Sequence, residues 1–556
     1  MAISSNTLAK PQGRNRAPFR VLYSNDTVNV VSCVSPEKLD ADFESEAEKG
    51  EPFRPEMIEA SINEAGAADA HMLQPGNGWV PWWKSKVYPA DAHYRWFMEK
   101  TGLPVDSIGR YMMDGGDLVQ VFVNHCRRRR IVPFVSLRMN DYHGSEHADF
   151  LVDLIGGGAM PEGYTFGGIH RAAQSRFFLE HPQYRIGVDP AAYINCADRL
   201  AYIREMGTRY TLRNVRVLNW AIPEVRQHKF AFIRELCENY DIDGLELDFM
   251  RHFRYFRTEE TTSEERVKIM TGFVADVRRL LDHTAKATRK RWLCVRVPFR
   301  LAAHDPMGID LRKWVDAGVD MVNLSCHYAT DQQCDLPTVC RMIPEAAVYL
   351  ELTYTNLRYG EPSVHRKMSD EQFYTAAHLA YARGAAGVSF FNFAYYRQIG
   401  MTNREPPFHV LQRVKEPAWL ARQPQHYFLT SGSNTPPVPN PPFPTGTLTP
   451  KSPITFTMDM APPTGGWQTD GRLRVQGRQP LDECELVVAF NGAECLPSED
   501  ISEPYPAPYR DGLGTRETLR AWVVPRNLLK DGLNRIVVQM LQGNATALVF
   551  IDLAVK

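Results

Sequence analysis

The feature that most constrains this chain is an alternation of short apolar runs and amphipathic segments between about residues 18 and 430. Such alternation is typical of a parallel α/β sheet, in which each helix returns the chain to the same edge. Eight runs have the length and composition of strands: Phe19–Asn25, Ala68–Gln74, Val132–Asn140, Gly244–Met250, Trp292–Pro298, Met321–His327, Ala347–Thr355 and Gly387–Phe393. Helical patterns, such as Glu264–His283, Asp310–Ala317 and Asp370–Arg383, lie between most of them. Eight strand–helix units predict a closed (β/α)8 TIM barrel rather than an open doubly wound sheet.

A change of composition at residues 431–453 predicts where the barrel ends. We therefore assign the barrel to residues 18–430. The stretch is rich in Pro, Ser, Thr and Gly and is typical of a semi-extended linker. Short alternating runs follow it, and they predict a β-sandwich accessory domain at residues 454–556. Residues 156–212 are too long for an ordinary βα loop, so we expect an insertion over the barrel mouth. Residues 1–17 are expected to form a disordered N-terminal segment.

The charge balance argues against several classes of partner. The formal net charge is −1, which offers no basic excess for nucleic acid or for an anionic membrane. The dense basic run Arg127–Arg130 is interpreted as the solvated end of a helix. No apolar stretch reaches the roughly 18 residues that span a bilayer. The N-terminus lacks the apolar core of a signal peptide, so the chain as it stands is expected in the cytoplasm, or outside it if a leader was removed.

The cysteines predict neither a zinc ribbon nor a redox motif, because the ten are scattered singly and form no C-x-x-C pair. Cys334 with Cys340, or Cys484 with Cys495, remain open as disulfide pairs. No cofactor is expected, and the oligomeric state is left open.

Side-chain parity along the strands identifies candidate catalytic acids. Alternate residues of a barrel strand face the lumen, and active sites lie at the C-terminal strand ends. In the fourth run Leu245 and Leu247 suit the helix layer, so Glu246 and Asp248 point inward. In the seventh run the same test turns Glu351 inward. Two carboxylates flanking one bond are what glycoside hydrolysis requires, one as acid and one as nucleophile or base.

The same parity test turns Arg138 and Arg296 inward, and buried ion pairs with these arginines are the alternative interpretation of the acids. If Glu351 is not the partner of Asp248, then Glu246, Asp26 and Asp141 are the next candidates. Other polar side chains at the strand ends complete the predicted substrate site: Arg138, Asn140, Asp141, His143, Arg251, Arg296, His327, Tyr328 and Asn392. Two lumen arginines also suggest an anionic sugar.

Three tryptophans lie close together in the segment after the second run. Trp79, Trp82 and Trp83 occur within five residues. Aromatic faces stack on sugar rings, so these side chains are candidates for a substrate platform. A tryptophan cluster that pins the loop is the equal alternative. In the C-terminal domain Trp522 sits in an apolar run and is expected in the core, while Trp467 is a candidate contact residue.

The segment around the fourth run resembles the family-10-like glycosyl hydrolases. The matching positions are Pro223, Glu224, Val225, Arg226, Tyr240, Asp241, Asp243, Gly244, Asp248, Phe249 and Arg251. The resemblance implies a sugar-cleaving barrel and points to Asp248. The run is also similar to the family-18 chitinases, in which the last acid donates the proton. That position is Met250 here, which argues against their mechanism. The strands after the linker resemble the galactose-binding-like sandwiches that follow many glycosidase barrels.

The leading hypothesis from the sequence is therefore a glycoside hydrolase that degrades a poly- or oligosaccharide. Asp248 or Glu246 would be the general acid or base, and Glu351 the second carboxylate. A metal-dependent deacetylase or amidohydrolase is one alternative, with His71, Asp141, His143 and His327 as ligands. A barrel that binds carbohydrate without cleaving it is the other, because fold alone does not establish catalysis.

Overall fold

The computed structural model of this protein describes residues 16–29, 53–141, 143–144, 151, 172–187, 195, 197, 217–359, 364–398, 405–431, 443–444, 446–506 and 515–556. Most of the predicted N-terminal segment, of the insertion at 156–212 and of the linker at 431–453 lies outside the described residues.

Eight parallel strands close into a barrel in the order β1-β12-β9-β8-β7-β6-β5-β2. Each of the eight predicted runs contains one of them, so the predicted (β/α)8 fold is confirmed. The strands are β1 (Val21–Asn25), β2 (Ala70–Leu73), β5 (Val132–Arg138), β6 (Gly244–Asp248), β7 (Trp292–Pro298), β8 (Met321–Ser325), β9 (Ala347–Thr353) and β12 (Gly387–Phe391).

Several strands end two residues earlier than predicted, because the chain leaves the hydrogen-bonded ladder at the barrel mouth. After β8 and β12 the backbone turns through His327 and Asn392, which have φ values of 71° and 59°. This left-handed conformation is uncommon for residues other than glycine and is incompatible with a continuing strand.

The helices surround the barrel, and two of the longer ones begin at a capping box. Thr262 and Glu265 form a reciprocal capping box at the start of α12, and Ser369 and Gln372 form another at the start of α15. The described helices are α3 (Pro55–Glu64), α4 (Ala90–Thr101), α5 (Ser107–Met113), α6 (Leu118–Arg129), α8 (Arg176–Glu180), α11 (Pro223–Asn239), α12 (Ser263–Thr284), α13 (Leu311–Asp316), α14 (Leu336–Met342), α15 (Asp370–Ala382), α16 (Tyr395–Gln398), α17 (Val410–Arg413) and α18 (Pro417–Leu420). No described helix combines the length and apolar character needed to cross a lipid bilayer.

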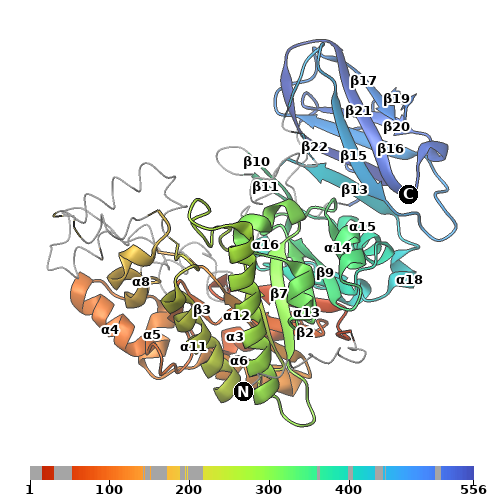
Figure 1. Ribbon diagram of the computed structural model, residues 1–556. Coiled ribbons are helices and arrows are strands. Elements are labelled where there is room, and N and C mark those ends of the chain that lie inside the picture. Colours follow the sequence, from red (N-terminus) through yellow and green to blue (C-terminus); the bar gives the residue numbers. More distant parts are fainter. Residues whose placement is uncertain are drawn as a thin grey trace, which may run out of the picture.

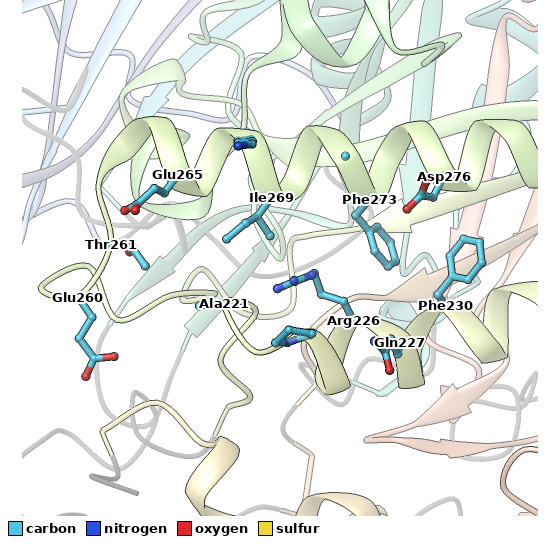
Figure 2. A pocket seen from close by; sticks show the side chains of 13 residues that line it. Ala221, Arg226, Gln227, Phe230, Glu260, Thr261, Glu265, Ile269, Phe273 and Asp276 are labelled. Carbon is cyan, nitrogen blue, oxygen red and sulfur yellow. The ribbon is translucent and has the colours of Figure 1, made fainter. Parts of the chain in front are cut away.

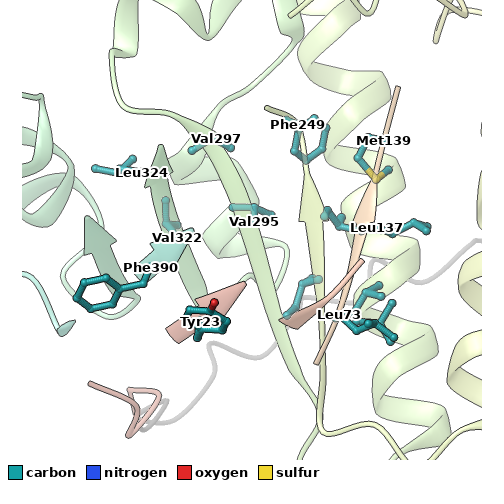
Figure 3. Packing of buried hydrophobic residues seen from close by; sticks show 14 of the residues in the cluster. Tyr23, Leu73, Leu137, Met139, Phe249, Val295, Val297, Val322, Leu324 and Phe390 are labelled. Atoms are coloured by element: carbon teal, nitrogen blue, oxygen red, sulfur yellow. The ribbon is translucent and has the colours of Figure 1, made fainter. Parts of the chain in front are cut away.

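Side-chain parity divides the barrel into two cores. Outward residues of the strands pack under the helices, and Figure 3 shows Val295, Val322 and Phe390 among them. Inward residues at the N-terminal strand ends form a separate apolar floor of the lumen, which includes Leu22, Met72, Phe134, Met321 and Tyr349. The predicted parity is thus correct on β6 and β9, where Glu246, Asp248 and Glu351 face the lumen above this floor.

A β-sandwich follows the barrel, as predicted. One sheet has the order β13-β22-β16-β20-β19 and the other β15-β21-β17-β18. Its strands are β13 (Gln425–Thr430), β14 (Thr447–Leu448), β15 (Ile454–Met460), β16 (Gly471–Gly477), β17 (Glu485–Phe490), β18 (Ala493–Glu494), β19 (Leu496–Ser498), β20 (Leu519–Val524), β21 (Gly532–Gln542) and β22 (Thr546–Val555). In Figure 1 this domain lies beside α14, α15 and the hairpin of β10 (Thr355–Tyr359) and β11 (Val364–Lys367).

The first strand of the sandwich comes from the segment that the sequence assigns to the barrel. Strand β13 precedes the Pro-rich stretch, yet it pairs antiparallel with β22 from Gln425–Val555 to Thr430–Phe550. Trp522 is buried in the sandwich core, as expected. The described cysteines, which include Cys334, Cys340, Cys484 and Cys495, are all free thiols, so neither open pairing forms.

Candidate active site at the barrel mouth

Arg296 joins two of the three predicted catalytic acids. Its Nε and Nη2 donate to the two carboxylate oxygens of Glu351, each at 2.6 Å, and its Nη1 donates to Oδ2 of Asp248 at 3.0 Å. The guanidinium also lies 4.2 Å from the ring centroid of Phe391. All three charged side chains are at most 2% exposed. The buried ion pair that the sequence left as an alternative is therefore present.

Glu351 is held entirely by protein groups. Besides Arg296, Asn323 donates to one of its carboxylate oxygens at 3.2 Å and Ser325 donates to the other. A carboxylate with this many donors is fixed in orientation and has little capacity left for a substrate. Asp248 has fewer donors: among the described residues, its Oδ1 accepts the backbone N–H of Met250, at 2.8 Å.

Glu246 lies two residues before Asp248 on the same strand and therefore one layer deeper in the lumen. Ser136 donates to its Oε1 at 2.7 Å and Asn323 to its Oε2 at 3.3 Å. Burial raises the pKa of Glu246 to about 7; Arg296 opposes this shift and the nearby Asp248 adds to it. Burial thus favours the protonated form of Glu246, the deepest of the three acids.

A second arginine cluster lies at the ends of β1 and β5. Nη2 of Arg138 pairs with Asp26, and its Nη1 donates to Oδ2 of Asp141 at 3.1 Å. Asp26 also accepts from Asn392 at 2.9 Å and from the hydroxyl of Tyr328 at 3.2 Å. Burial acts to raise the pKa values of Asp26 and Asp141, but the positive charge of Arg138 and neighbouring donors leave both below the ordinary value. The sequence analysis named Asp26 only as a substitute partner for Asp248, not among the catalytic or substrate-binding residues. Its position directly after the first strand was the sequence signal that could have placed it in the site.

The outermost groups at the mouth are Arg251 and the aromatic side chains around it. Nη1 of Arg251 donates to the Tyr328 hydroxyl at 2.7 Å and lies 3.4 Å from Nε2 of His327. Its Nη2 contacts Nε2 of His143, whose Nδ1 lies 2.6 Å from Asp141. Burial lowers the pKa of His143 to about 3 and that of His327 well below its ordinary value, and Arg251 adds to both effects. Both imidazoles are therefore neutral at pH 7.

Asn140 supports the loops rather than facing the lumen. Its amide donates to the carbonyl oxygens of Leu218 and Arg254, both at 2.9 Å, and accepts from the Leu218 N–H at 3.1 Å.

Two other residues of the motif, Asp241 and Asp243, lie before β6 and so at the opposite end of the barrel. They form ion pairs with Arg127 and Arg289.

The three tryptophans lie in the core rather than on an open face. Trp79, Trp82 and Trp83 are at most 2% exposed. Their indole N–H groups donate to the Asp141 carbonyl oxygen at 3.1 Å, the Tyr94 hydroxyl at 3.0 Å and the Glu235 carboxylate at 3.3 Å, respectively. The buried Lys229 covers the ring of Trp79 at 3.7 Å. The structure favours the alternative interpretation, a cluster that pins the loop.

The histidines considered for a metal site do not gather. His71 packs between Tyr23 and Phe122 on the helix side, with ring centroids 5.0 and 5.3 Å away. His143 and Asp141 are in contact, and His327 meets them through Arg251. Within the described part of the chain, no three His, Cys, Asp or Glu side chains are placed to share a metal ion.

One cavity lies away from these acids. It has a volume of about 700 Å³ and is formed between α11 and α12, with Arg226, Phe230, Ile269 and Phe273 in its wall (Figure 2). Both helices belong to the outer layer, so this cavity is not the mouth of the lumen.

No protein-family model and no curated protein sequence matches the chain. Among solved structures, α-L-fucosidase isoenzyme 1 from Paenibacillus thiaminolyticus is 12% identical over 94% of this chain and 96% of its own, with a TM-score of 0.34. The PgaB (BpsB) glycoside hydrolase domain from Bordetella bronchiseptica is 10% identical over 72% and 99%, with a TM-score of 0.40. A variant of the GH36 α-galactosidase AgaA from Geobacillus stearothermophilus is 11% identical over 98% and 56%, with a TM-score of 0.37. Because these identities and TM-scores are low, we assign the fold from the strand order of the barrel and not from these structures.

Proposed function

We propose that the barrel is a glycoside hydrolase whose reaction takes place at the C-terminal mouth. The observation that supports this most is the convergence of Asp26, Arg138, Asp141, Asp248, Arg296 and Glu351, from five different strands, above an apolar floor. Burying six charged groups together is costly, and barrels place such groups at this end when they act on a ligand. The domain division, with a barrel and an accessory sandwich, belongs to the same proposal.

Asp248 is our candidate for the reacting carboxylate. Arg296 and the Met250 N–H donate to its two oxygens and fix its orientation, which a nucleophile or a general base requires. Its partner is an acid of the Arg138 cluster, Asp26 or Asp141, because these lie at the same mouth. Glu351 then becomes the group that fixes Arg296, and Glu246 the acid of raised pKa beneath it.

A neutral sugar fits this charge distribution better than an anionic one. Arg138 and Arg296, which suggested an anionic substrate, are each shared by two carboxylates and carry no surplus positive charge. We therefore propose a neutral poly- or oligosaccharide, with Arg251, His327, Tyr328 and Asn392 lining its site. The resemblance to the family-10-like hydrolases supports the reaction class.

The second candidate function is a barrel that binds carbohydrate without cleaving it. The specific observation in its favour is that Asp26, Asp141, Asp248 and Glu351 are all ion-paired, and that Glu246, the lumen acid with a raised pKa, lies one layer below Asp248 and is bonded to Ser136 and Asn323. A proton donor with a raised pKa at the mouth itself is what hydrolysis would require.

One experiment separates the two candidates. Purified wild-type protein is screened against neutral and anionic glycans, beside Asp248→Asn, Glu351→Gln, Asp26→Asn and Asp141→Asn. We expect sugar release by the wild type, a loss of about 10³-fold or more in Asp248→Asn, and a smaller loss in Glu351→Gln. Asp241→Asn, in the same motif but at the far end of the barrel, is the matched control. Full activity of a folded Asp248→Asn protein would overturn the assignment, and binding without release would favour the second candidate.

A further inference from the structure

The loop after β8 connects the barrel mouth to the sandwich. It begins at the mouth with His327 and Tyr328 and reaches Gln332 and Gln333, both buried against the second domain. Over these few residues the chain passes from the candidate site to the interface between the two domains.

Two consecutive glutamines of this loop bind the backbone of both sandwich sheets. Nε2 of Gln332 donates to the His426 carbonyl oxygen at 3.2 Å, and its Oε1 accepts the Phe428 N–H at 2.9 Å; both residues belong to β13. Nε2 of Gln333 donates to the Asp459 carbonyl oxygen at 3.3 Å, and its Oε1 accepts the Asp459 N–H at 2.6 Å, on β15. A primary amide offers the same donor and acceptor as a peptide group, so each glutamine pairs with a strand as a neighbouring strand would.

The inner part of the loop is bonded to the end of β9. The Thr330 N–H donates to the Thr355 carbonyl oxygen at 2.8 Å, and the Thr330 hydroxyl accepts the Thr353 N–H at 2.7 Å. The Thr353 hydroxyl in turn donates to the Tyr328 carbonyl oxygen at 3.1 Å. The hairpin that follows β9 reaches the same domain, because Arg366 on β11 pairs with Glu503 of the sandwich at 3.0 Å. Two adjacent mouth loops are therefore anchored on the sandwich.

The two tryptophans of the sandwich that were considered as sugar contacts are buried or partly buried. In its described residues Trp522 is buried, and Trp467 is partly buried with its indole N–H donated to Gln425 at 2.7 Å. Stacking on a sugar ring requires an open aromatic face, which the buried Trp522 does not provide.

We propose that the sandwich is a positioning domain for the candidate site, and that Gln332 and Gln333 are the positioning residues that hold the His327–Tyr328 loop in place. The inference rests on the proposed function, because it takes the barrel mouth as the active site. Misplacing a group in such a site by about 1 Å can cost about 100-fold in rate, so a tether of this kind is important for turnover without touching substrate.

The test uses the full chain with Gln332→Met, Gln333→Met and the double variant. These keep side-chain volume and remove the four hydrogen bonds to the sandwich, together with a long one from Gln332 to the Gln372 carbonyl oxygen at 3.4 Å. His378→Leu is the matched control, because it removes another interdomain hydrogen bond, from α15 to the Pro462 carbonyl oxygen at 3.1 Å, and leaves the loop intact. Hydrogen exchange of residues 326–335 reports the tether, and kcat and KM on the glycan found in the screen report the site. If the glycan binds without turnover, its Kd is measured in place of kcat and KM.

We expect faster exchange of the loop in the double variant and at least a tenfold fall in kcat/KM or affinity, measured well below its Tm. The His378→Leu protein should keep wild-type exchange in the loop and wild-type kinetics. Unchanged exchange in the double variant overturns the proposal, and so does faster exchange with unchanged kcat/KM or Kd. If the wild type neither cleaves nor binds any glycan, the proposed function fails, and the exchange result alone then supports or overturns the tether.

Discussion

Arg138 and Arg296 in the lumen each pair with two carboxylates, and the acid beneath them is bonded differently. Arg296 donates to Asp248 and Glu351, while Glu246 accepts hydrogen bonds from the neutral side chains of Ser136 and Asn323. Burial is the main cause that raises the pKa of Glu246. Side-chain parity predicts which residues enter the lumen, but which acid pairs with a cation depends on side-chain contacts between strands.

Replacing Glu246 with glutamine should change stability in a pH-dependent way. The pKa of Glu246 is raised from 4.5 to about 7 in the folded protein. The stability that its bound proton contributes is therefore complete below pH 4.5 and is lost as the pH rises through 7. Glutamine has no charge to bury. The free energy of unfolding of Glu246→Gln relative to wild type should therefore increase between pH 5 and pH 8, by about 2–3 kcal/mol at most.

Urea unfolding at the two pH values measures this difference. Glu238→Gln, at an exposed position of α11, is the control for removing one carboxylate from the chain. A difference between Glu246→Gln and wild type that stays constant or shrinks from pH 5 to pH 8 would show that Glu246 is ionised throughout.

At the scale of strands and helices, local patterns predicted more of the fold than of the site. Alternation along β6 and β9 placed Glu246, Asp248 and Glu351 correctly, since strand parity is a local property. The burial of Trp83 depends on Glu235, 152 residues further along the chain, so nothing near the tryptophans indicated it. Strand β13 was not predicted as part of the sandwich, because its pairing with β22 is set by residues more than 100 positions later.

The start of β6 shows how closely the lumen floor is packed. A Cβ added at Gly244 would lie 2.1 Å from a ring carbon of Phe134, well inside van der Waals contact. Gly244→Ala should therefore destabilise the protein by about 1–3 kcal/mol. The Gly244→Ala, Phe134→Leu double variant should recover part of that loss, because the smaller side chain makes room for the methyl group.

A second glycine supplies the contrast. Gly272 is exposed within α12, and a Cβ there would meet no atom within 4 Å. Gly272→Ala should stabilise the protein by about 0.5–1 kcal/mol, because alanine has the higher helix propensity. Equal effects of the two substitutions in urea unfolding would contradict a crowded floor beneath β6.

At the scale of the whole molecule, the interface between barrel and sandwich combines apolar and polar contacts. Phe428 and Phe550 of the sandwich belong to the apolar cluster of the barrel, and Leu379 of α15 belongs to that of the sandwich. Arg383, which follows α15, donates to both carboxylate oxygens of Asp459, at 2.8 and 2.6 Å, to the Met460 carbonyl oxygen at 2.6 Å and to Asp531 at 2.9 Å. Bidentate, charge-assisted contacts of this kind hold surfaces in one orientation.

The interface predicts how the protein unfolds. Because Arg383, Gln332 and Gln333 tie both sheets of the sandwich to the barrel, wild-type protein should unfold in one calorimetric transition. Arg383→Ala leaves Asp459 without its cation at a partly buried site, and we expect the transition to separate into two, with the sandwich melting first. Arg312→Ala removes a comparable arginine, paired with Asp316 and Glu345 on the barrel surface, and should lower Tm slightly within a single transition. A single transition in both variants, shifted equally, would mean that Arg383 acts only as a surface ion pair and that the other interdomain contacts couple the domains without it.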